Sequence, residues 1–345
     1  MTRISYLLPF AGMGTDEVLA FARAVRRGPV ERLWQGQTSS ADPSHAFALA
    51  AGAGLAVPAG LGVTLAPLRH PFDAAVQARS LVACTGKPVV AGFGPGSRSF
   101  QQALRGEPYR SPLTAMREYL STVRALVGGG PVRIEGEYVR FDGALGGAAL
   151  PVEVGAGVLR PAMAHVAGAC ADVAITWMTP ADYVGGPIAT ALRAGAAEAD
   201  REPPRVVVMI GVALAGPDAD LPRLVMAAHG RHLRQEHYRA MLGAAGVGVP
   251  ARFRDLAAAV ADGGAFLHGH PDQVADALDR FAAAGVDEIV LNLAASCAVR
   301  GVDAALAEAE AITRSFLGRA TSSRAVSRPS NTRSTTEVLH ATTTH

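Results

Sequence analysis

The sequence predicts an α/β protein, a (β/α)8 TIM barrel with loop insertions and a disordered C-terminal tail. Two observations predict it. Short apolar runs alternate with amphipathic stretches along the chain, which is typical of parallel strands covered by helices. Eight such runs occur in 345 residues, and an eight-unit barrel needs about 250 residues or more. With 49% hydrophobic residues, the chain can bury a large core.

The eight expected strands are short runs that are mostly β-branched or apolar, as is typical of buried parallel strands. They span residues 4–8, 31–36, 61–66, 88–93, 151–154, 172–177, 205–214 and 287–293. The alternative is an open, doubly wound sheet. That fold would carry GxGxxG after its first strand, whereas residues 8–14 are LPFAGMG.

The expected helices carry recognisable start and stop signals. Thr15 precedes two acidic residues and an i, i+4, i+7 apolar pattern, and Gly28-Pro29 ends that helix. Other helices are expected to begin with a cap residue followed by proline. These pairs are Asp42-Pro43, Ser111-Pro112, Thr179-Pro180 and His270-Pro271.

Two segments interrupt the repeat and are expected to be loop insertions at the active-site mouth. Residues 97–111 are polar, and residues 128–150 contain Gly-rich turns around a hairpin at 132–134 and 138–141. The expected domain is a barrel over residues 1–317. Residues 318–345 are rich in Ser, Thr and Arg without an apolar period, so they are expected to form a disordered tail.

Charge and cysteine usage exclude several classes of protein. The chain has 32 basic and 30 acidic residues, and its near-neutral body argues against a nucleic-acid binder. The absence of a long apolar run or a signal-peptide pattern argues against a membrane protein. The three cysteines are widely spaced, which argues against disulfides and zinc and favours a cytoplasmic protein: Cys84, Cys170 and Cys297.

Glycines at predicted strand ends suggest an anion site. Residues 155–163 combine a Gly-Ala-Gly turn with a helix start, so backbone N–H groups and the helix dipole could hold a phosphate. Thr176, ending the next strand, could add a hydroxyl. Residues 92–96 form a similar loop. The competing interpretation is that these glycines only make tight turns.

Aromatic and histidine residues give further candidates. Trp34 and Trp177 end predicted strands, where a flat ring can stack on a planar cofactor or pack in the core. His70 precedes a proline and either contacts a ligand or caps a helix. His229 and His232 are three residues apart, but no HExxH motif or carboxylate set accompanies them, so no metal site is expected.

The predicted mouth contains few acid–base groups. No GxSxG elbow, Cys–His pair or carboxylate pair stands at the strand ends. Chemistry supplied by a bound cofactor would explain this composition.

Several segments together resemble the bacterial-luciferase-like monooxygenase superfamily. In order, they are PLRHP at 67–71, VVAGFGPG at 89–96, PVEVGAG at 151–157, ACADVAIT at 169–176, and LHGHPDQV with AGVDEIV near the end. The resemblance covers residues 2–317 and implies a TIM barrel that binds coenzyme F420 or FMN. It also implies a non-proline cis peptide ending the third strand, near residues 64–66.

The resemblance implies a set of site residues. The phosphate would lie at Gly155, Ala156, Gly157 and Thr176, and the ring near Gln37, Thr38, Thr64, Gly94 and Trp177. Substrate contacts are assigned to Trp34, His70 and His229. Many deazaflavin members have an Asp-His pair where this chain has Gln37-Thr38. Gln37 is therefore the candidate catalytic residue, and no catalytic acid is identified.

The chain looks most like the F420-dependent branch and, within it, a subgroup that reduces dehydroalanine in lanthipeptides. The expected reaction is hydride transfer from reduced F420 to a C=C bond, giving D-amino acids. An FMN-dependent monooxygenase and a cofactor-free scaffold protein are the alternatives. The expected partners are a peptide or small-molecule substrate and a second copy of the chain in a homodimer, with no nucleic acid and no membrane.

Overall fold

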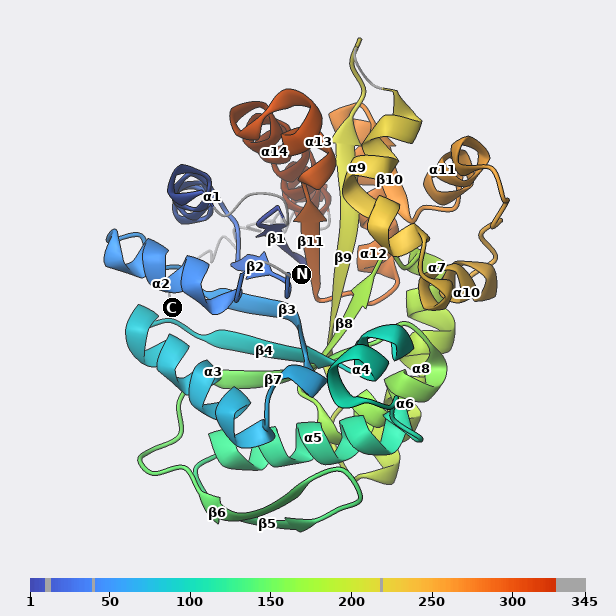
Figure 1. Ribbon diagram of the computed structural model, residues 1–345. Coiled ribbons are helices and arrows are strands. Elements are labelled where there is room, and N and C mark those ends of the chain that lie inside the picture. The colour runs from blue at the N-terminus through green and yellow to red at the C-terminus, as the bar shows by residue number, and fades with distance from the viewer. Residues whose placement is uncertain (10–13, 39–40, 218–219, 327–345) are drawn as a thin grey trace, which may run out of the picture.

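The computed structural model describes residues 1–9, 14–38, 41–217 and 220–326. Eight parallel strands close into a barrel, which confirms the predicted fold class (Figure 1). Strand β8 pairs with β9 and completes the ring. In ring order the strands are β1 (Arg3–Leu7), β2 (Leu33–Gln35), β3 (Ala59–Leu65), β4 (Val89–Gly94), β7 (Val152–Gly157), β8 (Val173–Trp177), β9 (Arg205–Leu214) and β11 (Glu288–Asn292).

Helices cover the outside of the ring (Figure 1). They are α1 (Thr15–Arg27), α2 (Ser44–Gly52), α3 (Pro71–Thr85), α5 (Pro112–Val127), α6 (Pro161–Cys170), α8 (Ala189–Glu198), α12 (Pro271–Ala283) and α14 (Val302–Val326). Two of the four predicted cap residues are N-caps: Ser111 accepts from Thr114 N–H at α5, and His270 N–H donates to the Gln273 side chain at α12. At α2 and α7 the N-cap is the proline, Pro43 and Pro180, rather than Asp42 and Thr179.

Shorter elements lie in the connections between the barrel strands. After β3 and β4 come η1 (Ala66–Leu68) and α4 (Arg98–Arg105). The predicted hairpin is present as β5 (Pro131–Glu135) and β6 (Arg140–Ala144) and lies below α5 in Figure 1. The remaining elements are α7 (Ala181–Tyr183), η2 (Val184–Ile188), α9 (Leu221–Leu233), α10 (Glu236–Ala244), α11 (Phe253–Asp262), β10 (Phe266–Gly269) and α13 (Ala294–Arg300).

Two features correct the expectations from sequence. Residues 268–270 were expected to form a turn, but His268 and Gly269 belong to β10, which pairs with the upper half of β9. The boundary expected at residue 317 falls inside a helix, because α14 continues to Val326. The remainder of the expected tail, residues 327–345, lies outside the described part of the chain.

The amino end of the barrel interior is closed by a buried ion network. Glu288 is fully buried, and its Oε1 accepts hydrogen bonds from Ser5 Oγ and Trp34 Nε1, both at 2.6 Å. The guanidinium groups of Arg32 and Arg205 lie 3.2 and 3.5 Å from its two oxygens. Two cations and two neutral donors thus compensate one buried carboxylate.

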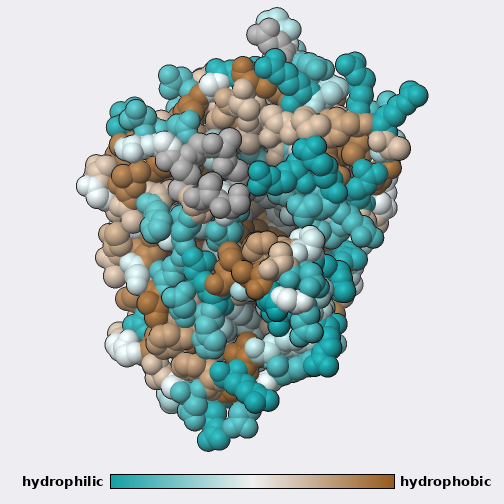
Figure 2. Space-filling view, viewed as in Figure 1, coloured by the Kyte–Doolittle hydropathy of each residue, from teal (hydrophilic) through white to brown (hydrophobic). Residues whose placement is uncertain are grey.

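Hydrophobic and hydrophilic residues are mixed on the outer surface: in Figure 2 the hydrophobic residues lie in small groups among hydrophilic ones. Among the described residues, no helix has the length and apolar character needed to cross a bilayer.

Candidate functional site at the carboxyl end of the barrel

An irregularity in β3 shapes the inner wall of the barrel mouth. The register between β3 and β4 shifts between Leu61 and Thr64, and the Gly62–Val63 peptide bond there is cis. The cis bond expected near residues 64–66 is therefore present, but slightly earlier in the strand. The inward-facing position before the shift is Gly62, which approaches Met209 from across the barrel. After it, Val63 also faces the interior.

Val63 and two glycines, one each from β4 and β7, form an apolar surface. A β-carbon at Gly94 or Gly157 would lie 3.0 or 3.4 Å, respectively, from a Val63 methyl group. Side chains at these positions would fill the space beside Val63. We call Val63, Gly94 and Gly157 the platform. Its bare backbone and methyl groups suit the face of a planar ring.

Gln37 lies beside the platform, as the resemblance implied. Its backbone N–H donates to the Val63 carbonyl at 3.1 Å, which ties the loop after β2 to the irregular part of β3. The side-chain amide nitrogen donates to the Thr38 carbonyl at 2.9 Å. The Oε1 atom is buried and accepts no hydrogen bond from a described residue. Gln37 is thus placed to accept a hydrogen bond at the mouth.

The start of α6 next to the platform fits an anion. Gly157 ends β7, and α6 begins after Arg160 without a side-chain cap, so its first N–H groups carry the positive end of the helix dipole. Thr176 on the adjacent strand β8 is fully buried, and its Oγ1 makes no hydrogen bond to a described residue. A phosphate oxygen would satisfy such a hydroxyl. These residues therefore fit the phosphate of a flavin-type cofactor.

Other predicted cofactor residues have local structural roles. Thr64 is buried, and its hydroxyl donates to the Gly92 carbonyl at 3.1 Å. The Thr38 hydroxyl closes a turn with Ala41. Gly155 is packed against Ile175, whose Cδ1 would lie 2.8 Å from a β-carbon at that glycine. Ala156 alternates with Gly155, so its methyl group points toward the helices. Only the backbone of these last two residues could face a ligand.

The structure gives local structural roles to two of the predicted substrate contacts. Trp34 is fully buried below the mouth, where its ring fills the space over Gly60 and its N–H donates to Glu288. His70 is the N-cap of α3: its Nδ1 accepts from the Phe72 N–H at 3.2 Å. Core packing explains the position of Trp34, and helix capping explains the position of His70.

The third predicted contact, His229, belongs to an aromatic cluster at the rim. Its ring meets Trp177 edge-on at 5.8 Å, and Trp177 lies 4.9 Å from His232. Tyr238 of α10 packs on His232 at 5.0 Å. Burial, with His232 nearby, holds the pKa of His229 well below its usual value, and burial lowers the pKa of His232 to about 4. The imidazoles are therefore neutral at pH 7.

The loop after β4 is held rigidly beside the mouth by one buried side chain. Gln101 of α4 donates to the carbonyls of Pro95 and Gly96 at 2.9 and 3.1 Å. Its Oε1 accepts from the Tyr109 N–H at 2.9 Å. The expected insertion is thus an ordered wall.

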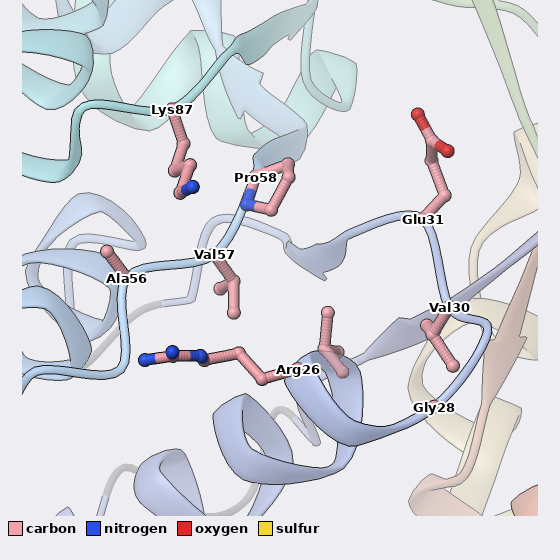
Figure 3. Close-up of a pocket in the computed structure, with 9 residues that line it drawn as sticks. Arg26, Gly28, Val30, Glu31, Ala56, Val57, Pro58 and Lys87 are labelled. Atoms are coloured by element: carbon pink, nitrogen blue, oxygen red, sulfur yellow. The ribbon is translucent and has the colours of Figure 1, made fainter.

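A separate cavity of about 530 Å³ lies at the opposite, amino end of the strands. Figure 3 shows Arg26 and Lys87 reaching toward it around Val57. In TIM barrels this end supports stability, while catalysis occurs at the other. Among the described residues, no group of His, Cys, Asp and Glu side chains is arranged to hold a metal ion.

Sequence reasoning missed Val63 and the polar residue Asn292 that ends β11. Val63 resembles any strand residue, since its inward turn depends on the shifted register. Asn292 has one usable signal: it is a polar residue that ends an apolar strand, where barrel active sites lie.

Comparisons with known proteins agree with this architecture. Over 151 residues the chain is 30% identical to 5,10-methylenetetrahydromethanopterin reductase of Methanolobus tindarius, a match that covers 43% of this chain and 45% of that protein. The chain thus matches less than half the length of that relative.

Solved structures share the fold. The coenzyme F420-dependent tetrahydromethanopterin reductase of Methanopyrus kandleri superposes with a TM-score of 0.68 at 20% identity, covering 92% of this chain and 99% of that one. The oxygenating constituent of 3,6-diketocamphane monooxygenase from Pseudomonas putida, in complex with FMN, gives 0.65 at 17% identity, covering 91% and 98%. The model of the luciferase-like monooxygenase family matches residues 2–288. The chain therefore belongs to this family of oxidoreductases.

Proposed function

We propose that the protein is an F420-dependent reductase that transfers hydride from the reduced deazaflavin to a C=C bond. The observation that carries the proposal is the glycine platform with the α6 start and the unpartnered Thr176 hydroxyl at one end. This geometry fits a planar ring with a phosphate tail. A structural neighbour that is coenzyme F420-dependent by name supports the deazaflavin, and a relative that is a reductase by name supports a reduction.

The residues of this chain would bind and orient the cofactor and the substrate. Gly157, the α6 start and Thr176 would hold the phosphate, while the platform would fix one face of the ring so that the other faces the mouth. The cofactor, when bound, supplies the hydride. Gln37 would accept a hydrogen bond from the ring edge or the substrate. The ordered α4 wall and the aromatic cluster would exclude water from the reacting atoms.

For the substrate, we propose a dehydroalanine or dehydrobutyrine residue in a lanthipeptide, reduced to a D-amino acid in the cytoplasm. The support is the resemblance of residues 4–10, 33–38 and 103–112 to that subgroup. The wall at α4 and α9 lie at the mouth, and the β5–β6 hairpin adjoins this wall through Tyr138, whose ring lies 5.3 Å from that of Tyr109. These segments would receive a peptide. A homodimer is part of the same proposal.

Titration of the purified protein with F420 and with FMN tests the cofactor. We expect tighter binding of F420, measured by quenching of its fluorescence. Gly157→Val should weaken binding at least tenfold because its side chain enters the platform. The matched control is Gly52→Ala, where a β-carbon has no neighbour within 4 Å. Equal affinity of Gly157→Val and wild type would contradict the proposed site.

The substrate is tested with reduced F420 and a dehydrated lanthipeptide precursor. A mass gain of two hydrogen atoms per reduced residue is expected. No gain on any such peptide would remove the peptide proposal but leave the cofactor proposal standing.

The second candidate is an FMN-dependent monooxygenase, which the FMN-bound structural neighbour favours. Preference for FMN together with oxygen consumption would establish it. Failure to bind either cofactor would instead support the scaffold alternative.

A further inference from the structure

Two fully buried polar side chains lie around one glycine at the mouth. Asn292 ends β11 and is in register with Gly211 of β9. From α9, His229 Nε2 lies only 2.3 Å from where a β-carbon of Gly211 would be. Gly211 is thus the residue that lets the imidazole reach the inner face of β9.

Both side chains have polar atoms without hydrogen-bond partners. The two ring nitrogens of His229 and Nδ2 of Asn292 are buried and make no hydrogen bond to a described residue. The Oδ1 atom of Asn292 already has a partner, since it accepts a hydrogen bond from the Ala294 N–H at 3.0 Å. Buried polar groups are nearly always paired, and an unpaired one destabilises the fold. Such a pair at one place points to a ligand.

The pair faces the platform. In the ring of eight strands, β9 and β11 lie four places from β3 and β4, so they stand on the opposite side of the barrel (Figure 1). The close approach of Gly62 to Met209, two residues before Gly211, confirms that β3 faces β9. A substrate lying on a ring held by the platform would therefore meet His229 and Asn292.

Both groups can donate hydrogen bonds to one acceptor. Neutral imidazole retains one N–H, and the Asn amide has two. Trp177 and Phe266 flank His229 edge-on at 5.8 Å each, which makes the surroundings apolar. In such surroundings a donor stabilises a developing negative charge strongly.

We propose that His229 and Asn292 bind the carbonyl oxygen of the substrate, and that the substrate class is an alkene conjugated to a carbonyl. The inference rests on the proposed function and adds the group that the protein recognises. As hydride from the reduced deazaflavin forms a C–H bond at the β-carbon, the π electrons move to the carbonyl oxygen, where both donors stabilise them. A proton from water then adds to the α-carbon, and the deazaflavin, left oxidised by loss of the hydride, releases its ring N–H proton, which neutralises the hydroxide. Neither side chain gives up its proton.

The test measures binding without turnover. N-acetyldehydroalanine methylamide is titrated calorimetrically into protein loaded with oxidised F420. We expect His229→Met to weaken binding about tenfold. His229→Gln keeps an amide donor and should stay within about threefold of wild type. Asn292→Ser, which keeps an oxygen for Ala294 N–H, should also weaken binding. The surface variant His45→Met is the control.

Two further measurements separate recognition from a structural role. His229→Met should melt at the wild-type temperature or above, because it removes unpaired nitrogens, whereas a structural histidine would leave a less stable protein. In histidine-labelled wild type, the His229 N–H resonance should shift when the probe binds. Unchanged probe affinity in both variants, an unmoved resonance, or no probe binding by wild type would overturn the inference. If wild type binds F420 normally, the proposed function survives that result.

Discussion

Buried polar residues differ in their hydrogen-bond and ion-pair partners at the two ends of the barrel. At the amino end, Glu288 is hydrogen-bonded by Ser5 and Trp34 and paired with two arginines. At the carboxyl end, Thr176 and His229 are just as buried and lack hydrogen bonds to described residues. At the amino end, buried atoms without a hydrogen bond, such as Glu288 Oε2 and Arg32 Nε, still face an opposite charge within 3.5 Å. No such ion pair compensates Thr176 or His229, which is the environment expected where a ligand binds.

Thr176→Val tests this contrast. Valine has nearly the same shape without the hydroxyl, so the cofactor-free variant should melt about 2 °C higher or at the wild-type temperature. The same change should weaken F420 binding about tenfold. The control is Thr122→Val, because the Thr122 hydroxyl donates to the Glu118 carbonyl at 2.7 Å and its loss should lower the melting temperature. A Thr176→Val protein that melts well below wild type would refute the interpretation.

The sequence identified residue types at the mouth better than their individual roles. Gln37, Gly94 and Gly157 lie around the platform, and Thr176 lies on the strand next to β7. Their contacts with a cofactor stay predictions. The sequence predicts Trp34 at the end of a strand and therefore as part of the mouth. It is the middle residue of β2, where its side chain packs below the mouth, and the sequence alone does not distinguish these two positions. Side-chain direction depends on register, which apolar patterning does not specify.

At the scale of elements, the barrel strands were predictable and the exceptions have physical causes. All eight ranges match observed strands because strands buried on both faces form apolar runs. β10 was missed because it is four residues long and contains His268. The β3 irregularity was expected only through resemblance, since no local pattern in residues 59–65 encodes it. The tail was expected from residue 318 because residues 318–326, the last turns of α14, lack an apolar stripe.

Gln101 should control the order of the wall beside the mouth. Gln101→Leu removes three hydrogen bonds that join α4 to residues 95, 96 and 109. We expect faster amide hydrogen exchange across residues 95–111, while exchange in the barrel strands stays unchanged. Gln102→Leu, on the exposed side of the same helix, should exchange like wild type. Equal protection in the Gln101 variant would mean that other contacts hold the wall.

At the scale of the whole molecule, the barrel separates stability from function along its axis. The network around Glu288 joins β11, β9, β1 and β2 at the amino end. The groups proposed to bind cofactor and substrate stand at the other end. Substitutions at the two ends should therefore change different properties.

Glu288→Leu should destabilise the fold by about 3–5 kcal/mol, because it leaves Arg32 and Arg205 without their shared carboxylate. Urea unfolding measures the loss. The control is Glu135→Gln, since Glu135 is 73% exposed and its ion pair with Arg133 should contribute at most about 1 kcal/mol. A loss for Glu288→Leu no larger than for Glu135→Gln would show that the network does not stabilise the barrel.

The rim histidines should make the stability of the whole chain depend on pH. Burial is the main cause that lowers the pKa values of His229, His232, His237 and His268. In the unfolded chain they take up protons below about pH 6.5, whereas His232 in the folded protein does so only near pH 4. The unfolded state therefore binds more protons in this interval, and the free energy of unfolding falls as pH drops from about 6.5 to about 4.

His232→Gln isolates this effect from the titration of carboxylates, which both proteins share. We expect the variant to lose less stability than wild type between pH 7 and pH 4.5, as measured by urea midpoints at constant ionic strength. His45→Gln, at an exposed position of α2, should follow the wild-type curve. Because α9 carries both His229 and His232, the smaller loss should appear together with weaker exchange of the α9 amides at low pH. Parallel curves for wild type and His232→Gln would show that the folded protein protonates this imidazole as readily as the unfolded chain does, and the rim would then be wetter and more open than its packing indicates.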